Sequence, residues 1–224
     1  MPMLRTLQEK VDPRHTAVVV VDVQNDFFAD GGTFDRIGRD VGVVRAMIPP
    51  LDRLLESARR VGTRVIFLRY EQNAATESEV HLEQRSRGRA DQAICSTGTW
   101  GADFYVVEPG VGEPVVIKNR YSGFISTNLD LVLKTLGVRT LVMTGIASNG
   151  CVEATARDGF MHDYYIVFAE DCTASYSADL HRAACTNITD AYGVVTSSGE
   201  LVALWDEAAA ATPAVANRQE REDA

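Results

Sequence analysis

Residues 17–23 read AVVVVDV, a run of β-branched apolar side chains with one carboxylate, Asp22, near its end. A half-exposed strand alternates apolar and polar residues, whereas a continuous run is typical of a strand buried on both faces of a parallel sheet. Five more runs share this pattern: TRVIFLR at 63–69, PVVIK at 114–118, TLVMTGI at 140–146, YYIVFAE at 164–170 and GVVTS at 193–197. The sequence therefore predicts a parallel sheet of six strands.

Segments with a helical period lie between most of these runs, at 41–60, 129–136, 151–162 and 177–192. Pro49 and Pro50 predict either a kink in the first segment or a main helix that begins at Pro50. Strands that alternate with helices indicate an α/β fold, with a doubly wound, Rossmann-like, mostly parallel six-stranded sheet and helices on both faces. We expect one domain over residues 1–224.

Two segments depart from this alternation. Residues 70–114 are polar, rich in Ser, Gly, Arg and Gln, and longer than an ordinary connection, so we expect a loop or lid beside the active site. Residues 212–224 are polar without an apolar period, and we expect this tail to fray.

Composition and charge exclude several classes of protein. The chain has 46% apolar residues, enough for a full core, and a net charge of −9 with no basic stripe, which argues against a nucleic-acid partner. No apolar run approaches the roughly 20 residues of a membrane span, and the opening MPMLRTLQEK is too polar for a secretory signal. We expect a cytoplasmic protein. The four cysteines show no CxxC spacing, so neither structural zinc nor a disulfide framework is predicted.

Three reactive side chains stand at the ends of three predicted strands: Asp22, Lys118 and, just after TLVMTGI, Cys151. Doubly wound sheets place their sites at the carboxyl ends of the strands, so an acid, a base and a thiol face one crevice. Singly, the carboxylate can be a helix cap and the lysine a solvated edge residue. Their convergence is what favours a catalytic site.

Cys151 follows a small-residue turn and opens a predicted helix. The helix amino terminus and the ammonium of Lys118 are expected to lower the thiol pKa, and the amides of Cys151 and of Ala147 or Ser148 can hold an oxyanion. Among the histidines only His81, in the long polar segment, can approach the thiol, so Asp22 is the better candidate for the base.

Three motifs in this order resemble the isochorismatase-like cysteine hydrolase superfamily: VVVDVQNDFFADGG at 19–32, IKNRYSGFISTNLD at 117–130 and TGIASNGCVEATARDGF at 144–160. The superfamily includes nicotinamidases and the N-carbamoylsarcosine, biuret and ureidoacrylate hydrolases. The resemblance implies that Asp22, Lys118 and Cys151 form the catalytic triad. It also implies a cis peptide bond between Ile146 and Ala147, with the amides of Ala147 and Cys151 in the oxyanion hole.

Departures from the superfamily's branches narrow the expected substrate. Nicotinamidases carry a metal site built on an Asp-x-His pair and a further His, which RYEQNAATES at 69–78 lacks, so neither metal nor cofactor is expected. Isochorismatases share a segment like KNRYSGF at 118–124 but tend to lack the cysteine, so vinyl-ether hydrolysis is the alternative. RYSGF, GIASN, CVEAT and RDGF are most similar to ureidoacrylate amidohydrolases, while Gly150 resembles the carbamoylsarcosine branch. We expect a cysteine amidohydrolase of a small amide, carbamoyl or ureide substrate, ureidoacrylate-like by preference, acting through a thioester.

Substrate contacts are expected from polar and aromatic residues near the triad: Asn25, Phe28, Tyr121, Phe124 and Ser148 or Asn149. Phe28 and Phe124 can equally be core residues, and Asn149 can be a helix cap. Arg120 can pair with a substrate carboxylate or with a structural acid. Residues of the long segment can close over the substrate or contact another subunit: Trp100, Arg85, Arg87 and Arg89.

The resemblance also implies a homo-oligomer. Rival readings from other classes are a thiol redox protein that uses Cys151 and a non-catalytic binding protein on the same fold.

Overall fold

A single parallel sheet runs through the computed structural model, which describes residues 2–87 and 93–211. Its six strands lie in the order β3-β2-β1-β4-β5-β6, and all neighbours pair in parallel. Their bounds are β1 Thr16–Val21, β2 Arg64–Tyr70, β3 Val115–Lys118, β4 Thr140–Ile146, β5 Tyr165–Ala174 and β6 Gly193–Thr196. The predicted fold class is confirmed.

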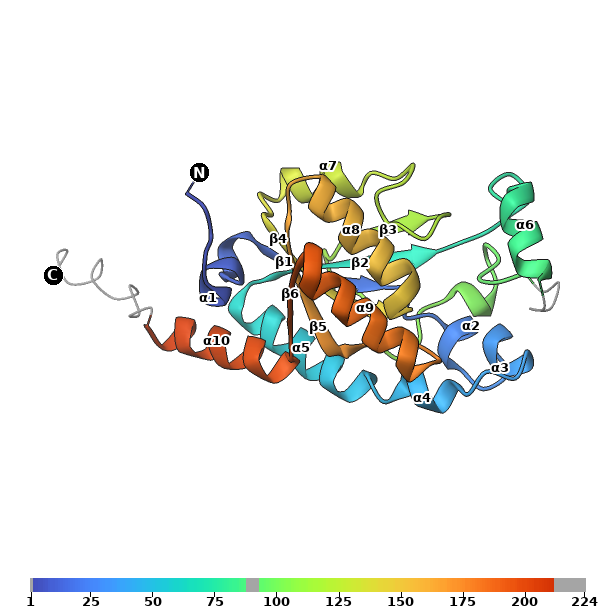
Figure 1. Cartoon of the computed structure of the whole chain (residues 1–224), viewed down its shortest axis with the longest axis horizontal. Coiled ribbons are helices and arrows are strands. Elements are labelled where there is room, and N and C mark those ends of the chain that lie inside the picture. The colour runs from blue at the N-terminus through green and yellow to red at the C-terminus, as the bar shows by residue number, and fades with distance from the viewer. Residues whose placement is uncertain (1, 88–92, 212–224) are drawn as a thin grey trace, which may run out of the picture.

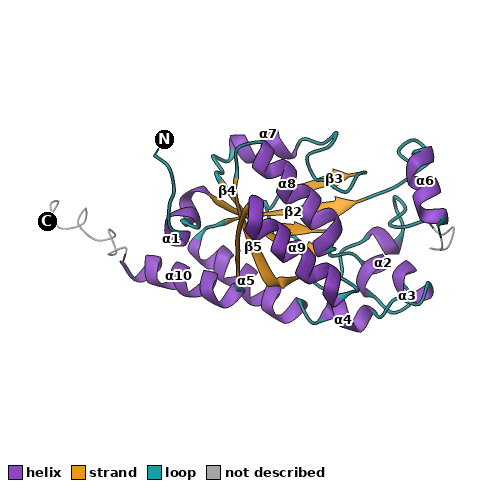
Figure 2. Ribbon diagram, viewed as in Figure 1, coloured by secondary structure: helices purple, strands orange, loops and turns teal. Residues whose placement is uncertain are grey.

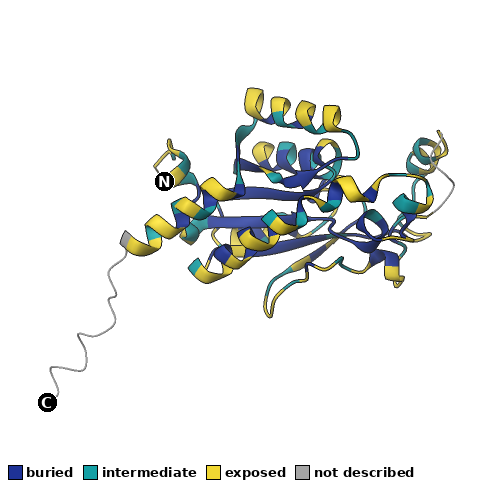
Figure 3. Ribbon diagram, turned by 90° about the horizontal axis from the view of Figure 1, so that it is seen from below, coloured by how far each residue is buried: buried dark blue, intermediate teal, exposed yellow. Residues whose placement is uncertain are grey.

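Helices cover both faces of this sheet, as Figures 1 and 2 show. Alternate residues of β1 explain the two layers: Val18 and Val20 pack with α5 (Ile48–Val61) and α10 (Ser198–Ala211), whereas Val19 and Val21 pack with α7 (Leu129–Thr135), α8 (Glu153–Met161) and α9 (Ala178–Ala191). Every residue of β1 is buried, and the central strands are dark blue in Figure 3. The continuous apolar pattern therefore has its expected cause, burial on two faces.

The helical segment expected at 41–60 is two helices, α4 (Val41–Arg45) and α5. Pro49 and Pro50 lie in the first turn of α5, where a missing backbone N–H costs nothing, so the main helix begins at Ile48 rather than at Pro50. At its other end Gly62 adopts φ +78° and stops the helix in the left-handed conformation.

The described residues of the long polar segment, 70–87 and 93–114, contain more regular structure than the sequence suggested. They include α6 (Glu79–Ser86) and the short 3-10 helix η2 (Trp100–Ala102), and Cys95 is fully buried between them. Arg89 and the predicted tail 212–224 lie outside the described residues.

Further short helices and one long one were not predicted. They are α1 (Leu7–Lys10), η1 (Pro13–His15), α2 (Asn25–Phe28), α3 (Thr33–Arg36) and α10. In Figure 1, α2, α3 and α6 gather at one end of the molecule and α1 and α10 at the other. No helix in residues 2–87 and 93–211 is long and apolar enough to cross a membrane.

Candidate active site

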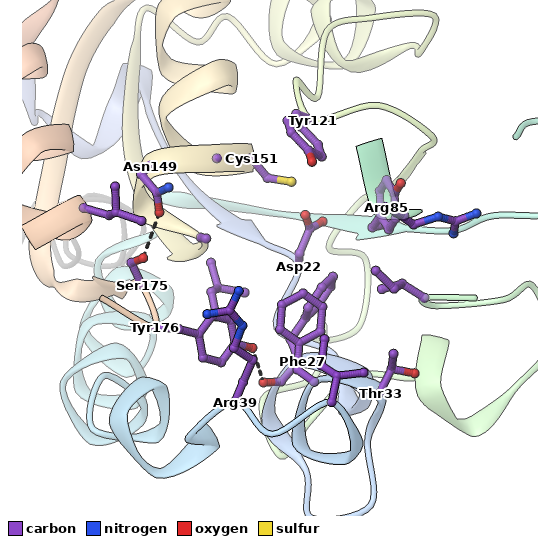
Figure 4. Close-up of a pocket in the computed structure, with 18 of the residues that line it drawn as sticks. Asp22, Phe27, Thr33, Arg39, Arg85, Tyr121, Asn149, Cys151, Ser175 and Tyr176 are labelled. Carbon is purple, nitrogen blue, oxygen red and sulfur yellow. Dashed lines mark hydrogen bonds between the residues drawn. The ribbon is translucent and has the colours of Figure 1, made fainter. Parts of the chain in front are cut away.

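Asp22, Lys118 and Cys151 meet at the carboxyl edge of the sheet. Asp22 directly follows β1, Lys118 ends β3, and Cys151 lies in the kinked turn η3 (Ser148–Val152) that follows β4. Lys118 Nζ lies 2.8 Å from Asp22 Oδ2, with exposed side-chain fractions of 0% and 1%. Figure 4 shows the thiol of Cys151 facing the carboxylate of Asp22.

A close approach of two strands positions Asp22. Asp22 adopts φ +54°, and its amide donates to the carbonyl of Leu68 at 3.1 Å. On the neighbouring strand Gly145 has φ +101°, and a Cβ there would lie 2.0 Å from the carbonyl oxygen of Val21. Only glycine satisfies both conditions, and it lets the end of β4 lie against the end of β1.

Lys118 reaches over β2 toward Asp22. Its Nζ lies 4.8 Å from the centre of the Tyr70 ring, which supports the ammonium from one side, and donates to the carbonyl of Arg120 at 3.0 Å. Burial lowers the pKa of Lys118, but the charge of Asp22 and the neighbouring Cys151 outweigh it, so the net shift is upward. The lysine is therefore a permanent cation beneath the thiol.

Burial shifts the pKa values of Asp22 and Cys151 in the same direction. Burial raises the pKa of Asp22, and Lys118 opposes this rise. Burial also raises the pKa of the Cys151 thiol to about 12, with Lys118 lowering it and Asp22 raising it. The expectation of a thiolate near neutral pH is therefore wrong for this resting arrangement, because loss of solvation outweighs the ammonium. Cys151 is a neutral thiol beside a carboxylate that can accept its proton.

The backbone around Cys151 is fixed from several sides. The peptide bond between Ile146 and Ala147 is cis, and the carbonyl of Ala147 accepts from the amides of Gly150 at 2.9 Å and Val152 at 3.2 Å. The hydroxyl of Thr155 donates to the carbonyl of Cys151 at 2.7 Å. Cys151 thus sits in a kinked turn in which Gly150 has non-helical dihedral angles (φ −128°, ψ −108°), and the regular helix α8 begins only at Glu153.

A pocket of about 350 Å³ opens over Asp22 and Cys151. Asp22 and Cys151 form its floor, and Figure 4 shows many of its lining side chains. The other lining residues come from the segment after β1, the long polar segment, the segment after β3, the end of β4 with the turn after it, and the segment after β5: Phe27, Thr33, Phe34, Ile37, Arg39, Tyr70, Gln72, His81, Gln84, Arg85, Ile94, Tyr121, Ile146, Ala147, Asn149, Gly150, Ser175, Tyr176, Ser177 and Leu180.

Of the side chains expected to bind substrate, the pocket brings Tyr121 to its wall and, of the pair Ser148 or Asn149, Asn149. Phe28 is fully buried in the core, stacked on Tyr105, and its neighbour Phe27 lines the pocket instead. Phe124 packs against His162, so the core alternative describes both phenylalanines.

Asn25 and Ser148, two polar residues also expected to bind substrate, turn away from the pocket. Asn25 is buried and donates to the carbonyl of Trp100 at 2.8 Å. The hydroxyl of Ser148 is buried and lies 2.8 Å from Nδ1 of His181, so it secures the turn rather than the substrate. Asn149 does line the pocket, and its side chain accepts a hydrogen bond from Ser175 at 2.8 Å.

The arginines of the polar segments have different roles. Arg120 donates to the carbonyls of Thr76 and Asn119, so it anchors a loop and does not line the pocket. Arg87 pairs with Glu83 on α6 and Trp100 is exposed, and neither lines the pocket. Arg85 and His81 do line it, as does Arg39, which sequence reasoning missed.

Another missed set follows from the length of β5. The strand continues to Ala174, beyond the predicted end at 170, so Ser175, Tyr176 and Ser177 emerge at the pocket. Residues 171–177 are polar and small, so no apolar run marked this extension of the strand, which continues after a register shift opposite Met143 and Gly145.

In the described ranges no cluster of three or more His, Cys, Asp or Glu side chains could hold a metal ion.

Comparison with known proteins agrees with this architecture. The model of the isochorismatase domain matches residues 16–200. The chain is 33% identical over 219 residues to a protein named ureidoacrylate amidohydrolase RutB from Agrobacterium fabrum, covering 89% of this chain and 94% of that protein. Its counterpart of the same name from Rhizobium rhizogenes is 34% identical over 213 residues, with coverages of 88% and 86%.

Solved structures give the same family. A cysteine hydrolase from Pseudomonas syringae pv. phaseolicola superposes with a TM-score of 0.79 at 25% identity, covering 93% of this chain and 99% of that chain. N-carbamoylsarcosine amidase from Thermoplasma acidophilum superposes with a TM-score of 0.67 at 26% identity, with coverages of 82% and 96%. With the family model matching most of its length, the chain belongs to the isochorismatase family of hydrolases.

Proposed function

We propose that the protein is a cysteine-dependent amidohydrolase that cleaves a small ureide, carbamoyl or amide substrate through a thioester, with ureidoacrylate as the favoured substrate. The observation that carries the proposal is the buried ion pair of Asp22 and Lys118 directly beside the Cys151 thiol on the floor of the pocket. A purely structural ion pair would not need a thiol beside it at the floor of a pocket, whereas a catalytic carboxylate and nucleophile would.

In the first half of the proposed reaction, Asp22 accepts the thiol proton as the sulfur attacks the carbonyl carbon. The amides of Ala147 and Cys151 hold the oxyanion, while Lys118 fixes the orientation of Asp22 and balances the negative charge that develops on sulfur. The carbon–nitrogen bond then breaks, Asp22 gives its proton to the departing nitrogen, and the acyl group remains on Cys151.

In the second half, water replaces the departed amine. Asp22 takes a proton from this water as its oxygen attacks the thioester, and the carbon–sulfur bond breaks with return of the proton to sulfur. The enzyme returns to a neutral thiol and an ionised carboxylate, the resting state that burial favours for Cys151.

The preferred substrate class rests on similarity. The two curated relatives described above are named ureidoacrylate amidohydrolases, and a similar solved structure is an N-carbamoylsarcosine amidase. Both names describe cleavage of a carbonyl that bears nitrogen on both sides. A pocket of about 350 Å³ is at the small end of ligand sites, in keeping with a small substrate.

The test is turnover of a substrate panel by chelator-treated enzyme: a ureidoacrylate analogue, N-carbamoyl amino acids, biuret, nicotinamide and isochorismate. We expect ammonia release from a ureido or carbamoyl compound, reduced at least about a thousandfold in Cys151→Ala because the nucleophile is gone. Cys185→Ala is the matched control, since this cysteine is half-buried on α9 outside the pocket. A quenched reaction should also show the acyl mass on Cys151.

Two outcomes would contradict the proposal. Turnover of isochorismate that survives in Cys151→Ala would indicate vinyl-ether hydrolysis without a nucleophilic cysteine. Equal loss of activity in Cys151→Ala and Cys185→Ala would show that the thiol of Cys151 has no special role.

A further inference from the structure

Arg39 is a cation of the pocket for which the described residues provide no counterion. It lies in the loop between α3 and α4, is half-buried, and lines the pocket. Within the ranges 2–87 and 93–211, its side chain has no hydrogen bond or ion pair with a protein group. A guanidinium that is partly removed from water without an acid partner carries a desolvation cost. An anionic ligand in the pocket would offset this cost.

The other cations near the pocket already have partners. Lys118 pairs with Asp22, and Arg85 pairs with Glu77 and donates to Gln72 Oε1 at 2.6 Å. Burial and the nearby charges of Arg120 and Arg85 lower the pKa of His81, so its ring is neutral at neutral pH. Arg39 is therefore the side chain best suited to bind an incoming anion.

The wall next to Arg39 consists of aromatic rings. Phe34 stacks on Tyr176 with ring centres 5.0 Å apart, and Phe27 meets Phe34 edge-on at 5.0 Å. The hydroxyl of Tyr176 donates to the carbonyl of Phe27 at 2.6 Å, so the ring rather than the hydroxyl is offered to a ligand. Figure 4 shows Arg39 beside the Tyr176 ring. A group attached to the anion would thus meet carbon surface.

We propose that Arg39 binds a carboxylate of the substrate, and that the substrate is a ureide or amide whose carboxylate is carried on an apolar or unsaturated chain. One unpaired guanidinium matches the single negative charge of a carboxylate, and the planar fork of its N–H groups fits the two carboxylate oxygens. The position of the cleaved bond relative to this group rests on the proposed function, whereas binding of the anion does not.

The test measures binding to the Cys151→Ala variant, in which no turnover interferes. The probes are 3-ureidopropionate and its neutral amide, 3-ureidopropionamide, titrated by calorimetry at low salt. We expect the carboxylate to bind about tenfold to a hundredfold more tightly than the amide, because its hydrogen bonds to the guanidinium are charge-assisted. Adding Arg39→Gln should remove this preference by weakening only the carboxylate, and Arg39→Lys should keep part of it.

Arg53→Gln is the matched control, because Arg53 is exposed on α5, lies outside the pocket and loses the same charge. It should leave both affinities unchanged, and thermal melts should show that all variants fold. Equal affinity for the two probes, no binding of either, equal weakening of both by Arg39→Gln, or loss of the preference in Arg85→Gln instead would each overturn the assignment.

Separate assays with Cys151 intact distinguish this inference from the proposed function. A carboxylate preference that depends on Arg39 in an enzyme that hydrolyses no ureide or amide would refute the reaction and leave the anion site. Hydrolysis without a carboxylate preference would refute the anion site and leave the reaction.

Discussion

Asp22 and Cys151 share one buried environment, and their proton affinities together set the order of proton transfer and attack in the proposed reaction. Burial raises the pKa of the thiol to about 12, so the sulfur is protonated at neutral pH, and attack requires the carboxylate to remove the proton. The pKa of Asp22 is also raised by burial, against the pull of Lys118. The same loss of water that suppresses the thiolate therefore makes the carboxylate a stronger base.

The dependence of kcat/KM on pH should show this directly. Protonated Asp22 cannot accept a proton, so activity should fall as the pH decreases through the raised pKa of Asp22, at a higher pH than the ordinary value of 3.8 would give. No increase is expected near the ordinary cysteine pKa of about 8.5, because the thiol is not deprotonated there. A rise of kcat/KM between pH 8 and 9 on a stable protein, absent in Cys151→Ser, would instead show attack by a preformed thiolate.

At the scale of single elements, α2 shows how a one-turn helix divides two adjacent aromatic residues. Phe28 lies in the core with 0% exposure, and Phe27 lines the pocket. Sequence alone placed Phe28 at the substrate because both are apolar and a four-residue helix is too short to reveal which side faces inward.

Alanine substitutions in α2 should separate stability from binding. Phe28→Ala should lower the free energy of unfolding by about 3–5 kcal/mol, since it leaves a cavity in the core. Phe27→Ala should raise KM for a ureido substrate and cost less stability, because one side of its ring faces the pocket. Denaturant unfolding and steady-state kinetics on both variants provide the measurement, and a larger stability loss in Phe27→Ala would reverse the assignment.

Some elements could be predicted from the sequence and others could not. The six strands and the three polar side chains at their ends could be predicted because burial on both faces leaves a continuous apolar run and because parallel strands end at one edge. The kinked turn η3, the extension of β5 and the placement of Arg39 could not be predicted. These depend on backbone dihedrals, a register shift and a loop conformation that no local pattern encodes.

Over the whole molecule, the proposed catalytic side chains and a major stabilising contact lie at opposite ends. Trp205 on α10 is buried, and its indole donates to the carbonyl of Val11 at 2.7 Å. In Figure 1 this end of the molecule is far from α2, α3 and α6, which surround the pocket. The carboxyl edge of the sheet carries the proposed catalytic residues, while Trp205 at the other end joins α10 to the segment that precedes β1.

Trp205→Phe should therefore lower stability without changing catalysis. Loss of the indole leaves the carbonyl of Val11 without its donor, and we expect a decrease of about 1–3 kcal/mol in the free energy of unfolding. Values of kcat/KM below the melting temperature should stay within about twofold of the parent. Trp100→Phe is the control for stability, with an effect within about 0.5 kcal/mol because Trp100 is 54% exposed. A large change in kcat with Trp205→Phe would show that the two ends are coupled.

The placement of the two tryptophans has a practical consequence for spectroscopy. The chain has two tryptophans, Trp100 at 54% exposure on the pocket side and Trp205 at 1% exposure on α10. An indole in water emits at longer wavelength than one in an apolar interior, so the two emission bands report on different ends of the same molecule. Quenching by iodide should remove the long-wavelength band first, and a ligand that rearranges the pocket side should alter this band alone. The protein thus carries an intrinsic pair of optical probes that separates local events from global unfolding without any label.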